Sequence, residues 1–587
     1  MSSLLPGRPR LRLRVFSTVI LIIGLVFGWR LVDFQVIHSA EINKISYANR
    51  AVTRILPAMR GEILDSSGNV LAQTIFRYDV NAAPNIVAPF TVKQNGQDVT
   101  VTVDQAAAEI APLLKMSTSA VMAKLVGTSK YSNIAKRVDA SVYRQLEALN
   151  VPWLFYDAIP SRVYPNGAVA GNLIGFVGQD GTPLAGLELT MNSCLAGVDG
   201  QETYEKGAVD GIRIPSSAIV SKAPRNGSNV VLTINSSLQY YAQQVLLNYV
   251  ASEQAQWGTA LVIEAKTGNI LAAAEAPSVD PNKPGAVRAE NRGARIFQTA
   301  FEPGSTMKSI TAAIAVDTGK ATPATRVIAP FRMIMPFGGY IQDSELHPPM
   351  KLTLTGVLRD SSNTGIIQIG AKVPRQTRFN YLKKFGFGQR TSVNFEGESS
   401  GLLRDPNTWD KMTDKVSMFG QGVGVTPIQM AMAYQTIANG GQRLEPKLIA
   451  GCQDASGKMV TTPTAAPVKV IKQSTANQVI NMLEKVVEHG GIGHTASVPG
   501  YRIAGKSGTA QVREANGYYG IRHAISFIGM VPADNPQYVV AVSLFKPVTF
   551  SNSLGATPPF KAIMQQVLRT YRVPPSTTKS KWLPEQW

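Results

Sequence analysis

The sequence predicts an α+β protein with an N-terminal membrane helix, a module of mixed strands and helices, and a domain with an antiparallel sheet flanked by helices. One long apolar run lies close to the N-terminus, and short strand patterns alternate with helical ones after it. Strong strand patterns recur at both ends of the C-terminal half. With 587 residues, the chain is too long for one core and suits several folding units.

Composition and charge narrow the functional class. The net charge is +19, but the basic residues are scattered and no zinc-finger or aromatic RNA-binding signature accompanies them. We therefore expect no nucleic-acid partner, and an anionic cell-envelope surface fits the charge better. The only cysteines, Cys194 and Cys452, lie far apart, and the five histidines form no HExxH motif. This pattern argues against a disulfide scaffold, and we expect neither a metal nor a cofactor.

A membrane anchor is predicted at residues 15–37. Val15 to Trp29 is apolar, and Arg30 and Asp33 lie near its outer end, where long side chains can reach the membrane interface. A cleaved signal peptide is the alternative, but it needs small residues where Trp29, Arg30 and Leu31 stand. We therefore expect an uncleaved, single-pass anchor in the lipid bilayer.

The orientation of the anchor follows from four arginines that precede it, at positions 8, 10, 12 and 14. Basic residues stay on the cytoplasmic side of a membrane span. We therefore expect residues 1–14 to form a cytoplasmic tail and everything after about residue 37 to lie outside the cell membrane. No later segment reaches 18 apolar residues, so this anchor is the only one expected.

The module after the anchor contains turn signals but no grouping of acids, bases or nucleophiles. Arg54 to Ala72 is typical of a hairpin with its turn at residues 66–69, and Ala106 to Leu114 is typical of a helix. The glycine-rich stretch from Gly171 to Glu188 matches no nucleotide-binding fingerprint, so we expect tight-turn packing there. Lys222 to Asn229 is a candidate linker to the next domain.

The last domain is predicted to have one sheet built from both of its ends. An amphipathic helix capped by Ser236 or Ser237 should follow the first strand. Thr259 to Ala274 is typical of two strands joined by a turn, and Ile525 to Val542 of two more around a proline-containing turn. Because helical patterns fill the interval between these pairs, we expect an α+β domain.

The first candidate motif is Ser305-Thr306-Met307-Lys308. A proline and a glycine precede it, and Ile310 to Val316 is almost entirely apolar, so a buried helix is expected. Ser305 and Lys308 are three residues apart and should share one face of the first turn. Burial and the helix dipole both disfavour protonation of Lys308, which makes this lysine a candidate base for Ser305.

A second motif is needed because a serine and a lysine three residues apart, as in the first motif, are not specific to one function. Ser576 to Lys579 repeats it in a polar tail where no buried helix is expected. Ser361-Ser362-Asn363 lies between apolar helical stretches, where Ser361 could relay a proton and Asn363 could hold a substrate peptide group. Taken alone, such a triplet is more often a helix cap or a turn.

The third motif is Lys506-Ser507-Gly508-Thr509, on a predicted strand. Gly508 lets another backbone approach closely, and an edge strand can accept a substrate peptide as an added strand. Lys506, with the hydroxyl groups of Ser507 and Thr509, could bind a carboxylate. Alone, a lysine on an edge strand usually protects against aggregation. The order of the three motifs within one domain favours a single catalytic site.

Together these residues resemble the motifs of penicillin-binding proteins and serine β-lactamases, and the layout is similar to that of class B penicillin-binding proteins. Residues 60–72, 162–178 and 186–188 resemble the pedestal motifs of that class. Residues 419–441 and 493–510 are similar to its transpeptidase segments. The resemblance therefore extends over nearly the whole chain.

The resemblance implies a β-lactamase-like transpeptidase domain carried on an elongated mixed α/β pedestal. The expected divisions are a cytoplasmic tail (1–14), a transmembrane anchor (15–37), a pedestal or dimerisation domain (38–225), a transpeptidase domain (226–572) and a polar C-terminal tail (573–587). A glycan polymerase is missing from this class, so a separate polymerase and other division membrane proteins are implied partners.

The resemblance also implies roles for the site residues. Ser305 would attack the carbonyl between two terminal D-alanines of a stem peptide, and Lys308 would accept the serine proton. Ser361 would help to return a proton to the leaving D-alanine, while Asn363 holds the acyl-side backbone. The substrate carboxylate would be bound along Lys506, Ser507, Gly508 and Thr509, and the oxyanion hole formed by the backbone N–H groups of Ser305 and Thr509.

An amine of a neighbouring stem peptide would then take the acyl group, and β-lactams would trap Ser305 as covalent inhibitors. The segment RLVDFQVI after the anchor is similar to that of the division-specific member, and KLTLTGVLRDSSNTG has actinobacterial features. These features favour a septal enzyme over an elongation-specific one. Met307 and Ser507 depart from the usual residues of the family without removing a needed hydrogen-bonding group.

Other functions remain as alternatives. A membrane-bound serine β-lactamase or a β-lactam sensor would share the three motifs, but no ExxLN-type segment follows Asn363 and no sizeable inner domain is present. A non-enzymatic division scaffold would depend on the anchor and pedestal rather than on Ser305. The lifetime of a penicillin adduct and the effect of removing Ser305 would distinguish these functions from a transpeptidase.

Overall fold

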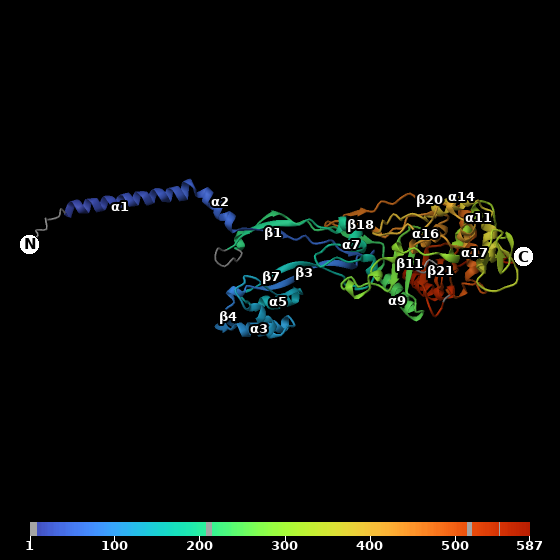
Figure 1. Cartoon of the computed structure of the whole chain (residues 1–587), viewed down its shortest axis with the longest axis horizontal. Coiled ribbons are helices and arrows are strands. Elements are labelled where there is room, and N and C mark those ends of the chain that lie inside the picture. The colour runs from blue at the N-terminus through green and yellow to red at the C-terminus, as the bar shows by residue number, and fades with distance from the viewer. Residues whose placement is uncertain (1–8, 95, 207–213, 514–518, 551) are drawn as a thin grey trace, which may run out of the picture. The chain divides into compact units, whose positions relative to one another are not determined.

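The computed structural model describes residues 9–94, 96–206, 214–513, 519–550 and 552–587 (Figure 1). Its contacts divide the chain into two compact units. The first contains Met1–Met59 and Gly197–Asn226, and the second contains Arg60–Ala196 and Gly227–Trp587. The boundaries between anchor, pedestal and transpeptidase domain that we expect from the sequence stay a prediction.

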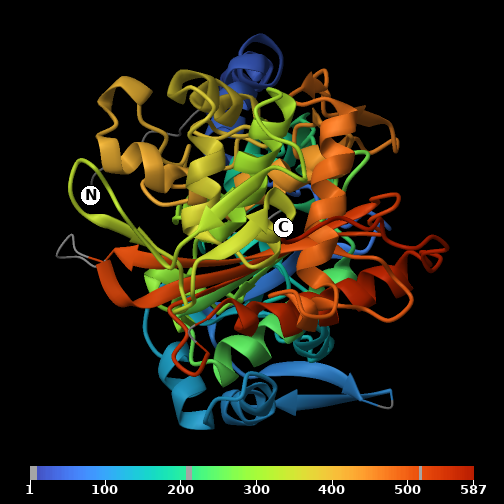
Figure 2. The ribbon, with the colours of Figure 1, turned by 90° about the vertical axis from the view of Figure 1, so that its right-hand side faces the viewer.

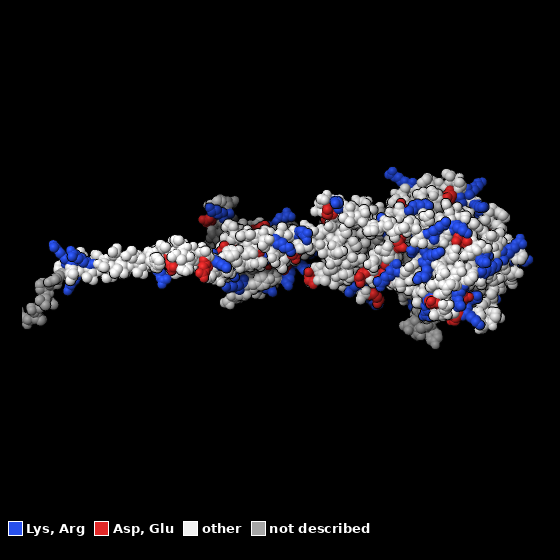
Figure 3. Space-filling view, turned by 90° about the horizontal axis from the view of Figure 1, so that it is seen from above, with Lys and Arg blue, Asp and Glu red and all other residues white. Residues whose placement is uncertain are grey.

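The first unit begins with the apolar helix that the sequence predicts. α1 spans Pro9–Val32 and continues through a π-helical turn, Asp33–Ile37, to α2, Ser39–Arg50. Pro9–Ile37 is long and apolar enough to cross a membrane. Figure 3 shows basic side chains at the start of this helix and a surface almost free of charge beyond them. A helix that is apolar on all faces fits a single-pass membrane anchor.

A three-stranded antiparallel sheet completes the first unit, with β8 (Gly200–Glu205) between β1 (Ala51–Leu56) and β9 (Ile219–Lys222). Arg54 lies on β1 and pairs with Glu202 of β8. The sequence placed Arg54 in a local hairpin, and this part of the prediction was wrong, because β1 finds its partner far along the chain. The hairpin itself forms nearer to its predicted turn, in the second unit.

The second unit starts with that hairpin, made of β2 (Ile63–Leu64) and β3 (Val70–Ala82). β3 pairs in addition with two later strands, and three helices pack against them around a core that includes Trp153. These elements are β6 (Ser132–Val138), β7 (Leu154–Val163), α3 (Val103–Leu113), α4 (Thr118–Leu125) and α5 (Ala140–Ala148), with a β4–β5 hairpin (Phe90–Gln94, Gln97–Val101) beside them. The helix expected near residues 106–114 is therefore confirmed as α3.

The glycine-rich stretch packs tightly, as predicted. Gly175 and Gly186 both adopt positive φ angles, +72° and +62°. A Cβ on Gly175 would lie 1.9 Å from the carbonyl oxygen of Ala185. Because only glycine permits this approach, the stretch fixes the start of α7, Gly186–Thr190.

Three motifs that are distant in the sequence meet at one buried carboxylate. Glu188 on α7 is fully buried and lies 2.6 Å from Arg60 Nε and 2.7 Å from Arg162 Nε. The hydroxyl of Tyr164 donates a third hydrogen bond to Glu188, at 3.3 Å. Two guanidinium groups and one carboxylate thus neutralise much of their charge inside the fold, where an unpaired charge would be costly.

Replacement of Glu188 by glutamine should lower the free energy of unfolding by about 3–5 kcal/mol, because both guanidinium groups would stay buried without a counter-charge. Thermal unfolding of the detergent-solubilised chain would measure the loss. Glu345→Gln, which removes an exposed carboxylate, is the matched control. Equal midpoints for the two variants would contradict a structural role for the Glu188 cluster.

The C-terminal half is built on a five-stranded antiparallel sheet in the order β12-β11-β23-β22-β21. These strands are β11 (Trp257–Glu264), β12 (Ile270–Ala276), β21 (Ala504–Arg513), β22 (Tyr519–Val531) and β23 (Tyr538–Phe545). β11 pairs directly with β23, where Thr259 faces Ser543. The prediction of one sheet made from both ends of this region is confirmed, and β21 lies at its edge.

Helices cover both faces of this sheet. Figure 2 shows the strands between yellow and orange helices on one side and the green α9 with the red α18 on the other. The first layer contains α11 (Met307–Asp317), α16 (Pro427–Ala438) and α17 (Gln473–Val487), and the second α9 (Ser236–Ser252) and α18 (Thr557–Thr570). The buried α11 carries Lys308 of the first candidate motif into the core between sheet and helices.

The cap predicted for α9 was wrong. Asn235 is the capping residue, and its side-chain oxygen accepts a hydrogen bond from the Leu238 backbone at 2.9 Å. Ser236 instead donates its hydroxyl to Asp65 of the β2–β3 hairpin at 2.6 Å. Asparagine and serine are equally good caps, so the contact with Asp65 decided between them.

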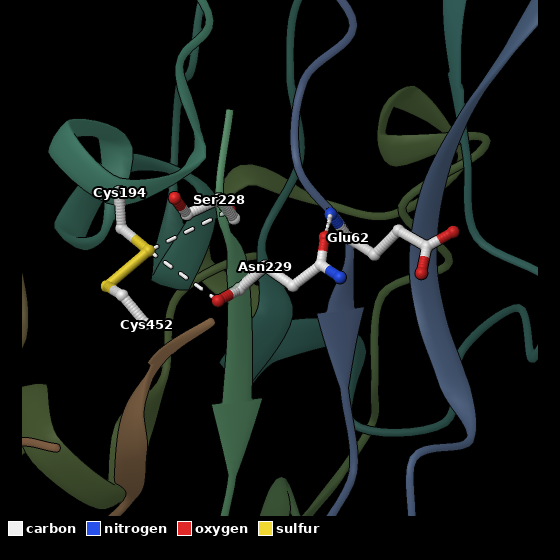
Figure 4. The surroundings of a disulfide bond; sticks show 5 residues. All are labelled: Glu62, Cys194, Ser228, Asn229 and Cys452. Carbon is white, nitrogen blue, oxygen red and sulfur yellow. Dashed lines mark hydrogen bonds between the residues drawn. A yellow bond between two sulfur atoms is a disulfide. The ribbon is translucent and has the colours of Figure 1, made fainter. Parts of the chain in front are cut away.

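The two cysteines form a disulfide, drawn in Figure 4. Cys194 lies in α8 (Asn192–Leu195), and Cys452 lies 258 residues later on β18 (Ile449–Gln453). β18 pairs with β10 (Asn229–Leu232), and β10 in turn pairs in parallel with β2. Two cysteines are too few for a scaffold of several disulfides. Their spacing did not predict this single bridge, because only the fold places the two residues side by side.

Candidate active site

Ser305 lies in a short turn at the start of the buried helix. Gly304–Thr306 forms a 3₁₀ turn that leads directly into α11, so Ser305 precedes the α-helix instead of lying in its first turn. The hydroxyl of Thr306 donates to the carbonyl oxygen of Pro303 at 2.7 Å and closes the turn. Ser305 is partly exposed whereas Gly304 and Thr306 are buried, so solvent reaches Ser305 alone within this turn.

Two glycines bring this turn against the edge strand β21. Gly304 has a φ of +56°, and a Cβ there would lie 2.4 Å from the carbonyl oxygen of Thr509. A Cβ on Gly508 would lie 2.9 Å from the carbonyl oxygen of Pro303. These close approaches require glycine at both positions, and they place Ser305 beside the Lys506–Thr509 motif.

Lys308 is fully buried on the first turn of α11. Burial lowers the pKa of its ammonium group from 10.5 to about 7, although the negative charge of Asp343 opposes the shift. Its Nζ donates to the backbone oxygen of Ser361, and to Ser361 Oγ at 3.2 Å. Within the described ranges no hydrogen bond joins Lys308 to the Ser305 hydroxyl, a contact that catalytic sites often make only with substrate bound.

Ser361 lies where both lysines meet. It occupies the turn between α12 (Leu354–Arg359) and α13 (Asn363–Gly370) and has a left-handed φ of +59°, which is strained for a serine. Lys506 Nζ donates to Ser361 Oγ at 2.9 Å, in addition to the contact from Lys308. The two lysines thus hold one hydroxyl group that can relay a proton between them.

Lys506 is fully buried on β21. It is therefore not an exposed edge-strand lysine of the kind that protects against aggregation. Burial lowers its pKa well below 10.5, and the positive charge of Lys308 lowers it further, while Asp360 opposes both effects. Its Nζ also donates to the backbone oxygen of Ser507 at 3.2 Å. Two lysines in one buried site cannot both keep a proton at low cost, which favours proton exchange there.

Asn363 is held by a carboxylate that the sequence did not single out. Its side-chain amide donates to the backbone oxygen of Gln342 at 2.8 Å. The buried Asp343 accepts hydrogen bonds from the Asn363 backbone, from Ser362 Oγ at 2.7 Å and from the Thr364 backbone at 3.0 Å. Asp343 lies 20 residues before Asn363, in a loop without a recognisable motif, so only the fold could reveal it.

A serine on a helix-start turn, a neighbouring lysine of lowered pKa and an edge strand that can bind a peptide form a site suited to nucleophilic acyl transfer. The fold and the site therefore define a serine acyl-transfer enzyme with a covalent intermediate. The structure brings residues of the three motifs together: Lys308, Ser361, Lys506 and Ser507 are joined by hydrogen bonds, and Ser305 lies beside β21.

Comparisons with known proteins identify the family. Residues 258–565 match the penicillin-binding protein transpeptidase domain, and residues 55–232 match the penicillin-binding protein dimerisation domain. Penicillin-binding protein PbpB of Mycobacterium tuberculosis is 33% identical over 96% of this chain and 85% of its own length. Peptidoglycan D,D-transpeptidase FtsI of Buchnera aphidicola is 29% identical over 97% of each chain.

A solved structure agrees with this result. Penicillin-binding protein 3 of Mycobacterium tuberculosis, complexed with ampicillin, has a TM-score of 0.70 and 28% sequence identity, and the match covers 91% of this chain and all of the other. The chain belongs to the penicillin-binding protein family, as a class B member in which a dimerisation domain precedes the transpeptidase domain.

Proposed function

We propose that this protein is a peptidoglycan D,D-transpeptidase that cross-links stem peptides of the cell wall in septal synthesis. The observation that carries this proposal is the meeting of Lys308 and Lys506 at Ser361, next to the Ser305 turn. It is supported by membership of the family and by a full-length relative named a peptidoglycan D,D-transpeptidase. Acyl transfer through a serine needs this combination of nucleophile, base and proton relay.

In the first step Ser305 Oγ attacks the carbonyl carbon between the two terminal D-alanines of a donor stem peptide. Neutral Lys308 takes the hydroxyl proton, and the backbone N–H groups of Ser305 and Thr509 stabilise the oxyanion. Ser361 passes a proton to the departing D-alanine amine as the C–N bond breaks. The products are an acyl ester on Ser305 and free D-alanine.

The substrate is bound along β21 in this proposal. The donor peptide adds to the edge strand, its carboxylate contacts Lys506, Ser507 and Thr509, and Asn363 holds the backbone on the acyl side. An amine of a second stem peptide then attacks the ester and gives up its proton, which returns to Ser305. A β-lactam imitates the terminal dipeptide and leaves a long-lived ester on Ser305.

The catalytic domain is proposed to lie outside the cell membrane, with residues 1–14 as the cytoplasmic tail. The arginines at the start of α1 favour this orientation. A disulfide between Cys194 and Cys452 also supports it, because disulfides persist in oxidising compartments. A separate glycan polymerase and other division membrane proteins would be the partners, and RLVDFQVI after the anchor favours septal over side-wall synthesis.

Mass spectrometry of the penicillin adduct tests nucleophile and activity together. After labelling and trypsin digestion, the added mass should lie on the peptide Ile296–Lys308, which contains Ser305, and not on Val573–Lys579, which contains Ser576. The adduct should persist after unbound penicillin is removed. Release within seconds would indicate a β-lactamase, and an adduct on Val573–Lys579 would overturn the assignment of Ser305.

A further inference from the structure

The segment after residue 572, expected from its sequence to be a polar tail, packs onto the domain that contains Ser305. It forms no helix, as predicted, but its side chains bond to the folded domain. The Arg502 backbone donates to Ser576 Oγ at 3.0 Å, and the Arg502 side chain donates to Thr578 Oγ1 at 2.6 Å. Thr578 in turn donates to Asp534 at 2.7 Å. The segment is therefore fixed before it reaches its last residues.

Pro584–Trp587, called here the strap, lies against the helix that leads to Ser361. The Thr353 side chain donates to the Pro584 carbonyl oxygen at 2.6 Å, and the Thr353 backbone donates to that of Glu585 at 3.0 Å. A Cβ on Gly356 of α12 would lie only 2.0 Å from the Glu585 carbonyl oxygen. The strap therefore covers the beginning of α12 at backbone contact distance.

One arginine connects the strap to the catalytic turn. Arg359 ends α12, two residues before Ser361, and its Nε lies 3.1 Å from the Glu585 carboxylate. Its other nitrogens reach Asp360 at 3.3 Å and the carbonyl oxygen of Gly490 at 2.9 Å. The guanidinium group thus holds the strap, the Asp360 side chain and the loop at Gly490 together, and the forked geometry of arginine is suited to this role.

Asp360 adds an electrostatic connection between this fork and the site. The negative charge of Asp360 acts on Lys506, whose Nζ donates to Ser361 Oγ at 2.9 Å. The charges of Arg359, Glu585 and Lys506 act on Asp360. A shift of Asp360 would change both the backbone before Ser361 and the field at Lys506.

We propose that Glu585 and Arg359 are positioning residues for acylation: the strap holds Arg359, and Arg359 holds the Asp360–Ser361 turn against Lys506. Neither residue touches the reacting atoms. The inference rests on the proposed function, because its effect is expected in the acylation of Ser305. An ion pair with a purely structural role would change stability and leave the acylation step as it was.

The test compares Glu585→Gln, Glu585→Asp and wild type as full-length chains in detergent. Glu585→Gln keeps the backbone contacts of the strap but frees Arg359. Acylation by fluorescent penicillin is followed at several concentrations, so that the maximal rate and the apparent binding constant are obtained separately. We expect a maximal rate lower by about 3- to 10-fold in Glu585→Gln, little change in binding, and partial rescue in Glu585→Asp.

Glu488→Gln is the matched control. It removes an ion pair with Lys485, at 2.8 Å, from the same domain, and Lys485 also contacts the C-terminal segment through Ser580. Arg359→Lys is the second variant, because lysine keeps the charge but lacks the fork, and it should slow acylation like Glu585→Gln. Thermal midpoints of all variants separate folding from catalysis.

The possible outcomes distinguish the two proposals. Wild-type acylation rates in Glu585→Gln and Arg359→Lys, or equal slowing in Glu488→Gln, would overturn the positioning role and leave the proposed function intact. A wild-type chain that takes up no penicillin at Ser305 would overturn the proposed function, and this inference with it. Slower acylation with unchanged thermal midpoints would support positioning.

Discussion

Replacement of Ser305 by alanine should reduce penicillin labelling of the full-length protein to background. The adduct is an ester on the serine oxygen, so no other atom of this residue can replace it. Ser361 is held by two lysines, and Ser576 has no buried helix behind it. Gel fluorescence after incubation with a labelled penicillin measures the effect, and cells that depend on the variant should fail to form septa.

Ser576→Ala is the control for this experiment, because Ser576 begins the second copy of the same four-residue spacing. We expect it to label to the same final extent as wild type. Labelling that survives in Ser305→Ala, or that is lost in Ser576→Ala at an unchanged thermal midpoint, would contradict the assignment. Normal septa and normal cross-linking in Ser305→Ala cells would favour the scaffold alternative.

Replacement of Lys308 by arginine should slow acylation by about 10²–10⁴-fold, the usual contribution of a general base. Arginine keeps a positive charge, but its pKa is too high for it to accept the serine proton. Stopped-flow or quenched labelling of the folded variant measures the rate. Lys320→Arg, at an exposed lysine after α11, is the matched control and should behave like wild type.

The wild-type enzyme should also show the pH dependence of this base. Burial holds the pKa of Lys308 at about 7 instead of 10.5, so the neutral amine predominates above about pH 7. The acylation rate should therefore rise as the pH increases through about 7 and then level off. A rate that is constant from pH 5 to 9, or a Lys308→Arg variant with wild-type rate, would exclude Lys308 as the base.

The sequence alone determined the features that depend on neighbouring residues. The apolar run that becomes α1 and the buried α11 follow from continuous apolar stretches, and the strand pairs of the five-stranded sheet follow from short apolar runs joined by turn residues. The three motifs could be found because their residues lie within four positions of each other. The order of these motifs within one domain then indicated a single site.

Only the tertiary structure decided which distant groups meet. Asp343 beneath Asn363, the disulfide from Cys194 and the pairing of Glu188 with two arginines all join segments far apart in the chain. The strap at Glu585 belongs with them, since its sequence is that of a polar tail. Such contacts depend on packing and desolvation in three dimensions, and no local pattern records them.

The same reason explains the limits of the site prediction. The sequence could name Ser305, Lys308, Ser361 and Lys506, because acyl transfer requires those residue types in short motifs. It predicted a lowered pKa for Lys308, but it could not state that Lys308 and Lys506 would share the hydroxyl of Ser361, or that burial would lower the pKa of Lys506 as well. Proton affinity is set by the surrounding fold, and the fold alone turns three common motifs into one catalytic centre.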